Sequence, residues 1–149
     1  MKRAATIALL SLASLTLTSC ERGIDIQIAG APFEPEFLVA GFDNGLFRGP
    51  QPGIDNVDVG QARGGQNRAL WSIDRDPSCA PTSRFHYGAA PDGWSTRVKG
   101  RPLEAGVTYV VSMSGCGFIG GRVFKILRGK IVSADGFGDQ PIETISAMK

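Results

Sequence analysis

The sequence Leu103-Glu104-Ala105-Gly106-Val107-Thr108-Tyr109-Val110-Val111-Ser112-Met113 sets the architecture of this chain. Gly106 suits a turn, and the run after it is rich in β-branched residues, which predicts a strand. A tyrosine at the start of such a strand can pack its ring inward while its hydroxyl bonds to backbone groups that have no partner in a sheet. We therefore expect the ring of Tyr109 to face the core.

This spacing of leucine, glycine turn and tyrosine resembles the tyrosine corner of Greek-key β-sandwiches. The resemblance implies that Tyr109 is largely buried and that its hydroxyl bonds to backbone near Leu103 to Ala105. The resemblance extends upstream, where Trp71, Pro77 and the run Phe85-His86-Tyr87 are similar to the second and third strands of fibronectin type III domains. It covers residues 68–127 and makes the strand of Tyr109 the sixth. Residues 21–65 do not fit that family, whose domains are shorter. The resemblance thus implies an elaborated fibronectin- or immunoglobulin-like sandwich.

The composition also favours an all-β protein, because 20 glycines and 9 prolines separate short runs of alternating or β-branched residues. We expect strands at residues 24–28, 37–42, 68–73, 84–87, 95–98, 107–114, 122–127 and 130–134. The glycine- and proline-rich segment 45–65 predicts a long irregular loop, interrupted at most by one short strand at 57–59.

Two turns and the C-terminus complete the expected elements. Arg128-Gly129 lies between two apolar runs and predicts a two-residue hairpin turn, whereas Pro91-Asp92-Gly93 predicts a turn that ends in a left-handed glycine. Asp139 could cap a short helix, although a frayed tail is the alternative. The apolar side of that helix would carry Ile142, Ile145 and Met148.

The first twenty residues have the pattern of an export signal. Lys2 and Arg3 supply a positive start, and Ala4 to Leu17 form an apolar run that is too short to span a bilayer. The closing tetrapeptide Leu17-Thr18-Ser19-Cys20 resembles the lipobox of bacterial lipoproteins. This resemblance implies cleavage before Cys20, a lipid on that residue, and a mature protein that is anchored rather than spanning. An ordinary secretory leader with a chance cysteine is the alternative.

Removing residues 1–19 from the 149-residue chain leaves residues 20–149, enough for a single domain. Without Lys2 and Arg3, the 16 basic residues fall to 14, equal in number to the 14 acidic residues. A neutral domain does not favour nucleic acid as a partner. Glu21 follows the anchor, and in enteric bacteria an aspartate there marks inner-membrane retention. The lipoprotein resemblance therefore implies the outer membrane, with the domain facing the periplasm.

Two cysteines remain after Cys20. In an oxidising compartment outside the cytoplasm, the pair Cys79 and Cys116 predicts one disulfide. A reduced pair is the alternative, and a metal site is less favoured because His86 is the only histidine. The fibronectin-like alignment places Cys79 in the loop after the second strand and Cys116 just after the sixth, so it implies that both lie at one end of the sandwich.

The glycine-rich segment around Cys116 is the main candidate for a binding loop. Residues 115–120 match the dinucleotide fingerprint letter for letter, but the following run is a predicted strand rather than the helix that a pyrophosphate needs. Phe118 and Ile119 could instead form an apolar tip that binds a partner, or fold back over the core. Trp94, which follows a glycine turn, could lie against a sugar or a partner, or cover a sheet edge.

The remaining polar candidates do not predict catalysis. No serine or cysteine nucleophile motif accompanies His86, so a structural or surface histidine is favoured. The aspartates match no calcium loop and are expected to serve turns. They are Asp55, Asp58, Asp135 and Asp139. We predict no catalytic residue, no metal and no cofactor.

The leading hypothesis is a lipid-anchored, periplasm-facing β-sandwich that acts as a non-catalytic binding or assembly component of the bacterial envelope. Its partners would be the membrane, through the lipid on Cys20, and an envelope protein or a cell-wall component. One alternative is a hydrolase with two facing carboxylates about 5 to 10 Å apart. Another is a small periplasmic inhibitor that inserts the Phe118 loop into the active site of an enzyme.

Overall fold

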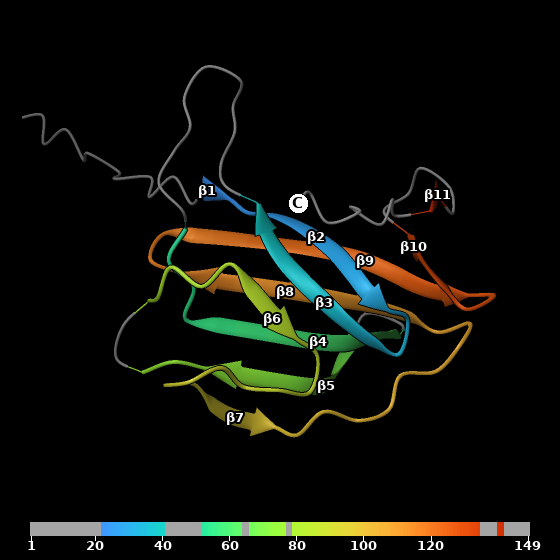
Figure 1. Ribbon diagram of the computed structural model, residues 1–149, viewed down its shortest axis with the longest axis horizontal. Helices are drawn as coiled ribbons and strands as arrows, with labels where there is room; N and C mark the ends of the chain where they lie inside the picture. Colours follow the sequence, from blue (N-terminus) through green and yellow to red (C-terminus); the bar gives the residue numbers. More distant parts are fainter. Residues whose placement is uncertain (1–21, 41–51, 64–65, 77–78, 135–139, 142–149) are drawn as a thin grey trace, which may run out of the picture.

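The computed structural model describes residues 22–40, 52–63, 66–76, 79–134 and 140–141, which form two β-sheets packed face to face (Figure 1). The strands are β1 (Arg22–Gly23), β2 (Asp25–Ala31), β3 (Glu34–Ala40), β4 (Asn56–Arg63), β5 (Gln66–Asp74), β6 (Arg84–His86), β7 (Ser95–Val98), β8 (Thr108–Gly115), β9 (Phe118–Leu127), β10 (Lys130–Ser133) and β11 (Gln140–Pro141). Among the described residues, the structure contains no helix with the length and hydropathy needed to span a bilayer. The leader and Cys20 lie outside these residues.

The larger sheet has the strand order β11-β10-β9-β8-β4-β5-β7, and β1 joins it by parallel pairing with β9. The smaller sheet has the order β2-β3-β6 and lies in front of the larger one in Figure 1. The runs β9-β8-β4-β5 and β2-β3-β6 follow the G-F-C-C′ and A-B-E orders of immunoglobulin-type sandwiches. The predicted all-β Greek-key sandwich is confirmed.

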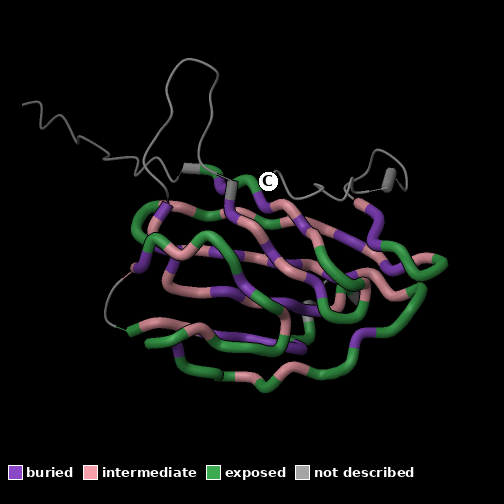
Figure 2. The backbone as a smooth tube through the Cα atoms, viewed as in Figure 1, coloured by how far each residue is buried: buried purple, intermediate pink, exposed green. Residues whose placement is uncertain are grey.

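The hydrophobic core fills the space between the sheets. Burial alternates along β8, so that Tyr109, Val111 and Met113 point inward while their neighbours are only partly covered (Figure 2). Phe37 of the smaller sheet joins the two layers, with its ring centroid 6.3 Å from that of Trp71 and 6.0 Å from that of Phe124. Each expected strand has a counterpart within the described residues, with ends that differ by a few positions.

The tyrosine corner is confirmed. Tyr109 is 2% exposed, and its hydroxyl bonds to the backbone of Glu104. Leu103 is buried beside it, and Gly106 takes a positive φ of 79° at the turn. The N–H of Gly106 also donates to the carbonyl of Ile126, which ties the turn to the next strand at 2.8 Å.

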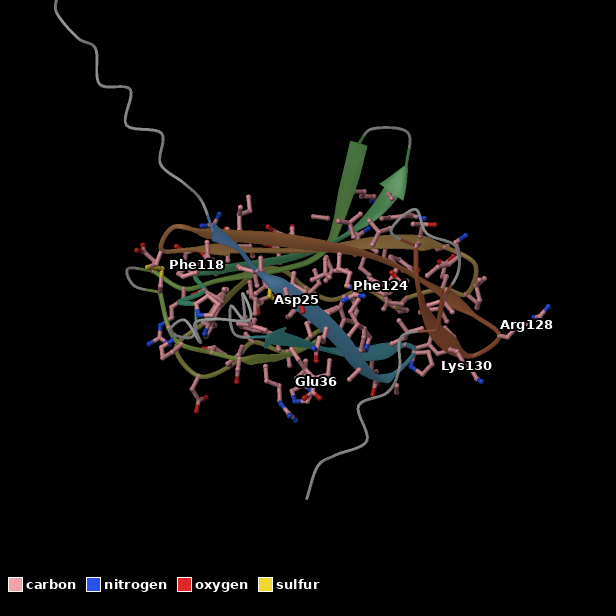
Figure 3. All side chains as sticks on the ribbon, turned by 90° about the horizontal axis from the view of Figure 1, so that it is seen from above. Asp25, Glu36, Phe118, Phe124, Arg128 and Lys130 are labelled. Carbon is pink, nitrogen blue, oxygen red and sulfur yellow. A yellow bond between two sulfur atoms is a disulfide. The ribbon has the colours of Figure 1, made fainter. Side chains whose placement is uncertain are left out.

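The predicted loop at 45–65 is wrong over its second half. β4 is a central strand of the larger sheet, bonded to β5 on one side and β8 on the other. Its fully buried residues Val57 and Val59 alternate with Asp58 and Gly60, and these two residues hid the strand pattern. The pairing with β5 shifts after Val59, which leaves Leu70 as an extra residue in a bulge. Beyond this bulge, the end of β4 and the start of β5 stand away from the sandwich (Figure 3).

The fibronectin-like numbering of strands is also wrong. β5, which carries Trp71, lies in the same sheet as the Tyr109 strand rather than in the opposite one. β6, which carries Phe85, belongs to the smaller sheet. A local apolar pattern shows that a strand faces a core, but the position of the strand in the sheet depends on its partners. Of β4, the sequence had indicated at most a short strand at 57–59.

The predicted turns are confirmed and the C-terminal helix is corrected. Arg128 and Gly129 form a two-residue hairpin turn with φ of 51° and 70°, and Gly93 is left-handed with φ of 79°. Gln140–Pro141 form β11, paired with Val132 and Ser133, so a helix does not begin directly after Asp139. Ile142, Ile145 and Met148 lie outside the described residues.

Candidate interaction site at the disulfide-linked end

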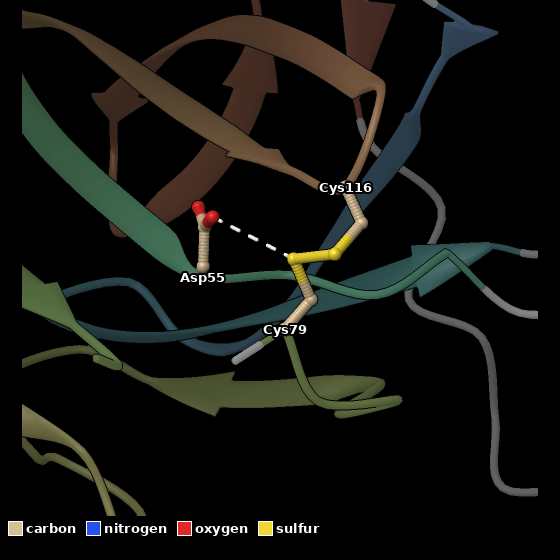
Figure 4. The surroundings of a disulfide bond; sticks show 3 residues. All are labelled: Asp55, Cys79 and Cys116. Atoms are coloured by element: carbon tan, nitrogen blue, oxygen red, sulfur yellow. Dashed lines mark hydrogen bonds between the residues drawn. A yellow bond between two sulfur atoms is a disulfide. The ribbon is translucent and has the colours of Figure 1, made fainter. Parts of the chain in front are cut away.

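A disulfide joins Cys79 and Cys116 at one end of the sandwich, with Cα atoms 6.1 Å apart (Figure 4). The predicted bond is therefore confirmed. Cys116 and Gly117 form the β8–β9 turn with φ of 43° and 80°. Cys79 follows β5, whose last residue Asp74 pairs with the first residue of β4 near this same end. The sequence separation of 37 residues corresponds to about 4 kcal/mol in the chain-entropy estimate.

The disulfide holds three segments together: 53–55, 79–80 and 115–117. The backbones of Ile54 and Ala80 bond to each other in both directions, at 2.9 and 3.0 Å. A Cβ added to Gly53 would lie 2.9 Å from the Cβ of Cys79, and one added to Gly115 would lie 2.5 Å from the backbone nitrogen of Asp55. These contacts leave no room for side chains, so the end of the domain is closely packed.

Asp55 lies against the disulfide. Its Oδ2 is 3.5 Å from Sγ of Cys79, the contact drawn in Figure 4. A disulfide sulfur carries no proton, so this is a van der Waals and electrostatic contact rather than a hydrogen bond given by a thiol. The backbone of Asp55 also bonds to Ser114 and Arg75. Asp55 therefore serves the structure of this end, but it lies directly before β4 rather than in the turn that was expected for it.

The predicted apolar loop at Phe118 and Ile119 is wrong in its form, because both residues belong to β9. Successive side chains of a strand point to opposite faces. Phe118 is partly buried and packs against the core, whereas Ile119 is 49% exposed on the outer face of the larger sheet. Of the two alternatives expected from the sequence, packing over the core describes Phe118 and exposure at the surface describes Ile119.

The segment after the predicted lipid site is bonded to this same end. Arg22 pairs with Phe118 and Gly23 with Ile119, and the N–H of Ile24 donates to the carbonyl of Ile119 at 2.9 Å. A Cβ on Gly120 would overlap the carbonyl oxygen of Ile24. The strand β1 was not predicted from the sequence, because two residues are too few to show a strand periodicity. Gly120 lacks a side chain and so leaves room for the backbone of Ile24, which is the one sequence feature that accompanies β1.

Trp94 does not lie on an exposed binding surface, so its predicted place there is wrong. It is 8% exposed, and its ring meets that of Phe85 edge to face at 5.1 Å between centroids. The tryptophan follows a left-handed glycine turn, as expected, but the turn directs the ring onto the core. Phe85 belongs to β6, an edge strand of the smaller sheet, so Trp94 covers a sheet edge, which is the alternative expected from the sequence.

His86 is an exposed residue on the outer face of the smaller sheet. Its Nε2 lies 3.2 Å from Oε1 of Glu36, which is also 3.1 Å from Nη1 of Arg84. These three side chains form a polar cluster at the surface, in line with the expected surface histidine. Within the described part of the chain, no three His, Cys, Asp or Glu side chains gather closely enough to hold a metal ion.

A depression of about 240 Å³ lies on the outer face of the larger sheet beside the β4–β5 bulge. It is lined by Asp58, Val59, Gly60, Ala69, Val110 and Ser112. Asp58 also lies near Arg97, whose pKa is raised mainly by a hydrogen bond to Asp74 and slightly by the charge of Asp58. Asp55 and Asp58 thus point to different places and do not face each other. Asp135 and Asp139 lie outside the described residues.

The disulfide-linked end therefore combines a rigid turn, an exposed isoleucine and the chain that leads directly from Cys20. No protein-family model, curated protein or solved structure matches this chain. Its function is inferred from the chemistry of its own residues.

Proposed function

We propose that this chain is a lipid-anchored, non-catalytic binding or assembly component of the bacterial cell envelope. A lipid on Cys20 holds the sandwich at the outer membrane, where it faces the periplasm. Its other partner is an envelope protein or a cell-wall component.

The pairing of β1 carries this proposal. Arg22 is only two residues after Cys20, and it is already bonded into the larger sheet beside Phe118. A lipid on Cys20 would therefore hold a folded domain directly at the bilayer. Such a domain keeps its far end and most of both sheet faces free for a partner.

The disulfide supports an exported location. Disulfides persist in oxidising compartments and are rare in the cytoplasm of ordinary bacteria. The bond between Cys79 and Cys116 lies on the surface side of the β8–β9 turn, where Cys116 is exposed. Export and the predicted leader are thus consistent with each other.

The test is fatty-acid labelling of the full chain produced in bacteria. We expect the wild-type protein to take up an alkyne-tagged fatty acid and to fractionate with membranes. Cys20→Ser should lose both the label and the membrane association. The matched control, Cys79→Ser combined with Cys116→Ser, should keep both. A Cys20→Ser protein that stays labelled in membranes would contradict the proposal.

The binding role is separated from the hydrolase alternative by a second measurement. Cross-linking of the anchored protein in living cells should give a discrete adduct with an envelope protein or a peptidoglycan fragment. Hydrolysis of purified cell wall by the domain, lost in Asp58→Asn, would instead favour an enzyme that uses the depression beside the bulge.

A further inference from the structure

We infer that the disulfide-linked end of the sandwich rests on the lipid bilayer, with the side chain of Ile119 in contact with lipid at the membrane surface. The opposite end, with the β9–β10 hairpin, then faces away from the membrane. This inference rests on the proposed lipid at Cys20 and adds the orientation of the domain to it.

The length of the tether limits where the lipid can lie. Two residues separate the Cα atoms of Cys20 and Arg22 by at most about 7 Å. Neighbouring strands are about 5 Å apart, and Arg22 pairs with Phe118. The Cα of Cys20 therefore lies within about 12 Å of the Cα of Phe118.

The tether is short because β1 is fixed to β9. Ile24 is 8% exposed, and its backbone N–H bonds to the carbonyl of Ile119. Its own carbonyl occupies the space that a side chain at Gly120 would fill. These contacts leave Glu21 as the one residue between the anchor and the sheet.

The far end of the sandwich lies well away from the anchored segment. β9 has ten residues, which span about 30 Å in extended form. Figure 3 shows Phe118 and Arg128 at opposite ends of the domain. Phe33 lies in the β2–β3 turn, which is at the same end of the domain as the β9–β10 hairpin (Figure 1).

Phe33 and Ile119 are the large hydrophobic side chains that are exposed among the described residues, at 47% and 49%. Their exposures are nearly equal, but only Ile119 lies beside the anchored segment. Apolar side chains gain free energy when they leave water for the acyl boundary.

The test uses the mature chain beginning at Cys20. Cys79 and Cys116 are bonded to each other, so Cys20 is the one free thiol and can be coupled to a maleimide phospholipid. The coupled protein is bound to vesicles of phosphatidylethanolamine and phosphatidylglycerol with brominated acyl chains, which quench tryptophan on contact. The two variants compared are Ile119→Trp and Phe33→Trp. Trp71 and Trp94 are buried and give both variants the same background.

We expect brominated vesicles to reduce the fluorescence of Ile119→Trp and to leave that of Phe33→Trp unchanged. Equal quenching of both, quenching of Phe33→Trp alone, or quenching of neither would overturn the orientation. If neither variant is quenched, the exposed side chain of Ile119 would instead be expected to contact a protein partner or a second copy of the chain. Because the lipid is attached chemically, this result does not depend on acylation in the cell, which the labelling experiment tests separately.

A charged residue gives a second readout that needs no added fluorophore. A single acyl chain binds membranes only marginally, so a loss of apolar contact is measurable. With a single-chain lipid on Cys20, Ile119→Asp should lower vesicle affinity about fivefold, and Phe33→Asp should not. Affinity lowered equally by both variants, or by neither, would contradict the contact at Ile119.

Discussion

The hydroxyl of Tyr109 accepts a hydrogen bond of 2.6 Å from the backbone N–H of Glu104 and donates one of 3.1 Å to the carbonyl oxygen of the same residue. One side chain thus satisfies both backbone groups of a residue that has no partner in a sheet. The ring of Tyr109 packs on Phe124 at 5.4 Å between centroids, within the core. The turn at Gly106 and the core are therefore fixed to each other.

Tyr109→Phe should lower the free energy of unfolding by about 1 to 2 kcal/mol, because both groups of Glu104 lose their partner. Tyr109→Ala should cost more, about 3 to 5 kcal/mol, because it also leaves a cavity. Tyr87→Phe is the control, since the Tyr87 hydroxyl donates a single exposed bond to the carbonyl of Arg101. Urea unfolding of the three variants measures these differences. Equal effects of the two phenylalanine variants would contradict the corner's role.

Alkaline pH should destabilise the domain. Burial raises the pKa of Tyr109 and of Tyr87 above the ordinary value of 10.0, although their backbone hydrogen bonds act in the opposite direction. The unfolded chain therefore releases these protons at lower pH than the folded protein does. The free energy of unfolding should not depend on these groups below pH 10.0 and should fall as the pH rises above it. Urea unfolding across that range measures the fall, which should be smaller in Tyr109→Phe. An equal fall in that variant would exclude Tyr109 as a cause.

Some elements could be predicted from the sequence because their signals are local. The tyrosine corner depends on residues within six positions of each other, and the Arg128-Gly129 turn on two. The full length of β4 could not be predicted, since Asp58 and Gly60 alternate with its valines in place of typical strand residues. Trp71 lies in the larger sheet because its strand, β5, pairs with β4. Its place in the sheet therefore could not be predicted without the full β4.

The disulfide of the candidate site could be predicted from the sequence, but the contacts around it could not. The pairing of Cys79 with Cys116 was predicted from the number of cysteines and from the oxidising compartment that the leader implies. That Ile119 is exposed while Phe118 packs on the core depends on where β9 begins, which the glycines around Cys116 obscured. The pairing of Arg22 with Phe118 joins residues that are distant in sequence, and no local pattern encodes it.

Gly120→Ala should strongly weaken the pairing of β1 with β9. A Cβ there would overlap the carbonyl oxygen of Ile24, and overpacking of this kind costs about 1 to 3 kcal/mol. Gly23→Ala is the matched control on the partner strand, because a Cβ at Gly23 meets nothing within 4 Å. Hydrogen exchange at the Ile24 amide should speed up in the first variant only. Unchanged exchange in Gly120→Ala would argue against a fixed tether.

Removing the disulfide should separate its structural role from a functional one. Cys79→Ser combined with Cys116→Ser should lower the free energy of unfolding by about 4 kcal/mol. If the bond also shapes an interaction site, partner recognition should weaken more than the folded population does. Reduced wild-type protein that is still folded provides the comparison. Equal binding by its reduced and oxidised forms would leave the disulfide as a structural bond alone.

The anchor on Cys20 is tested most directly by intact mass spectrometry of the full chain purified from bacterial membranes. We predict a mature protein that begins at Cys20, lacks residues 1–19 and carries the mass of a lipid on that cysteine. An intact leader with an unmodified Cys20, or cleavage at another residue, would contradict the account.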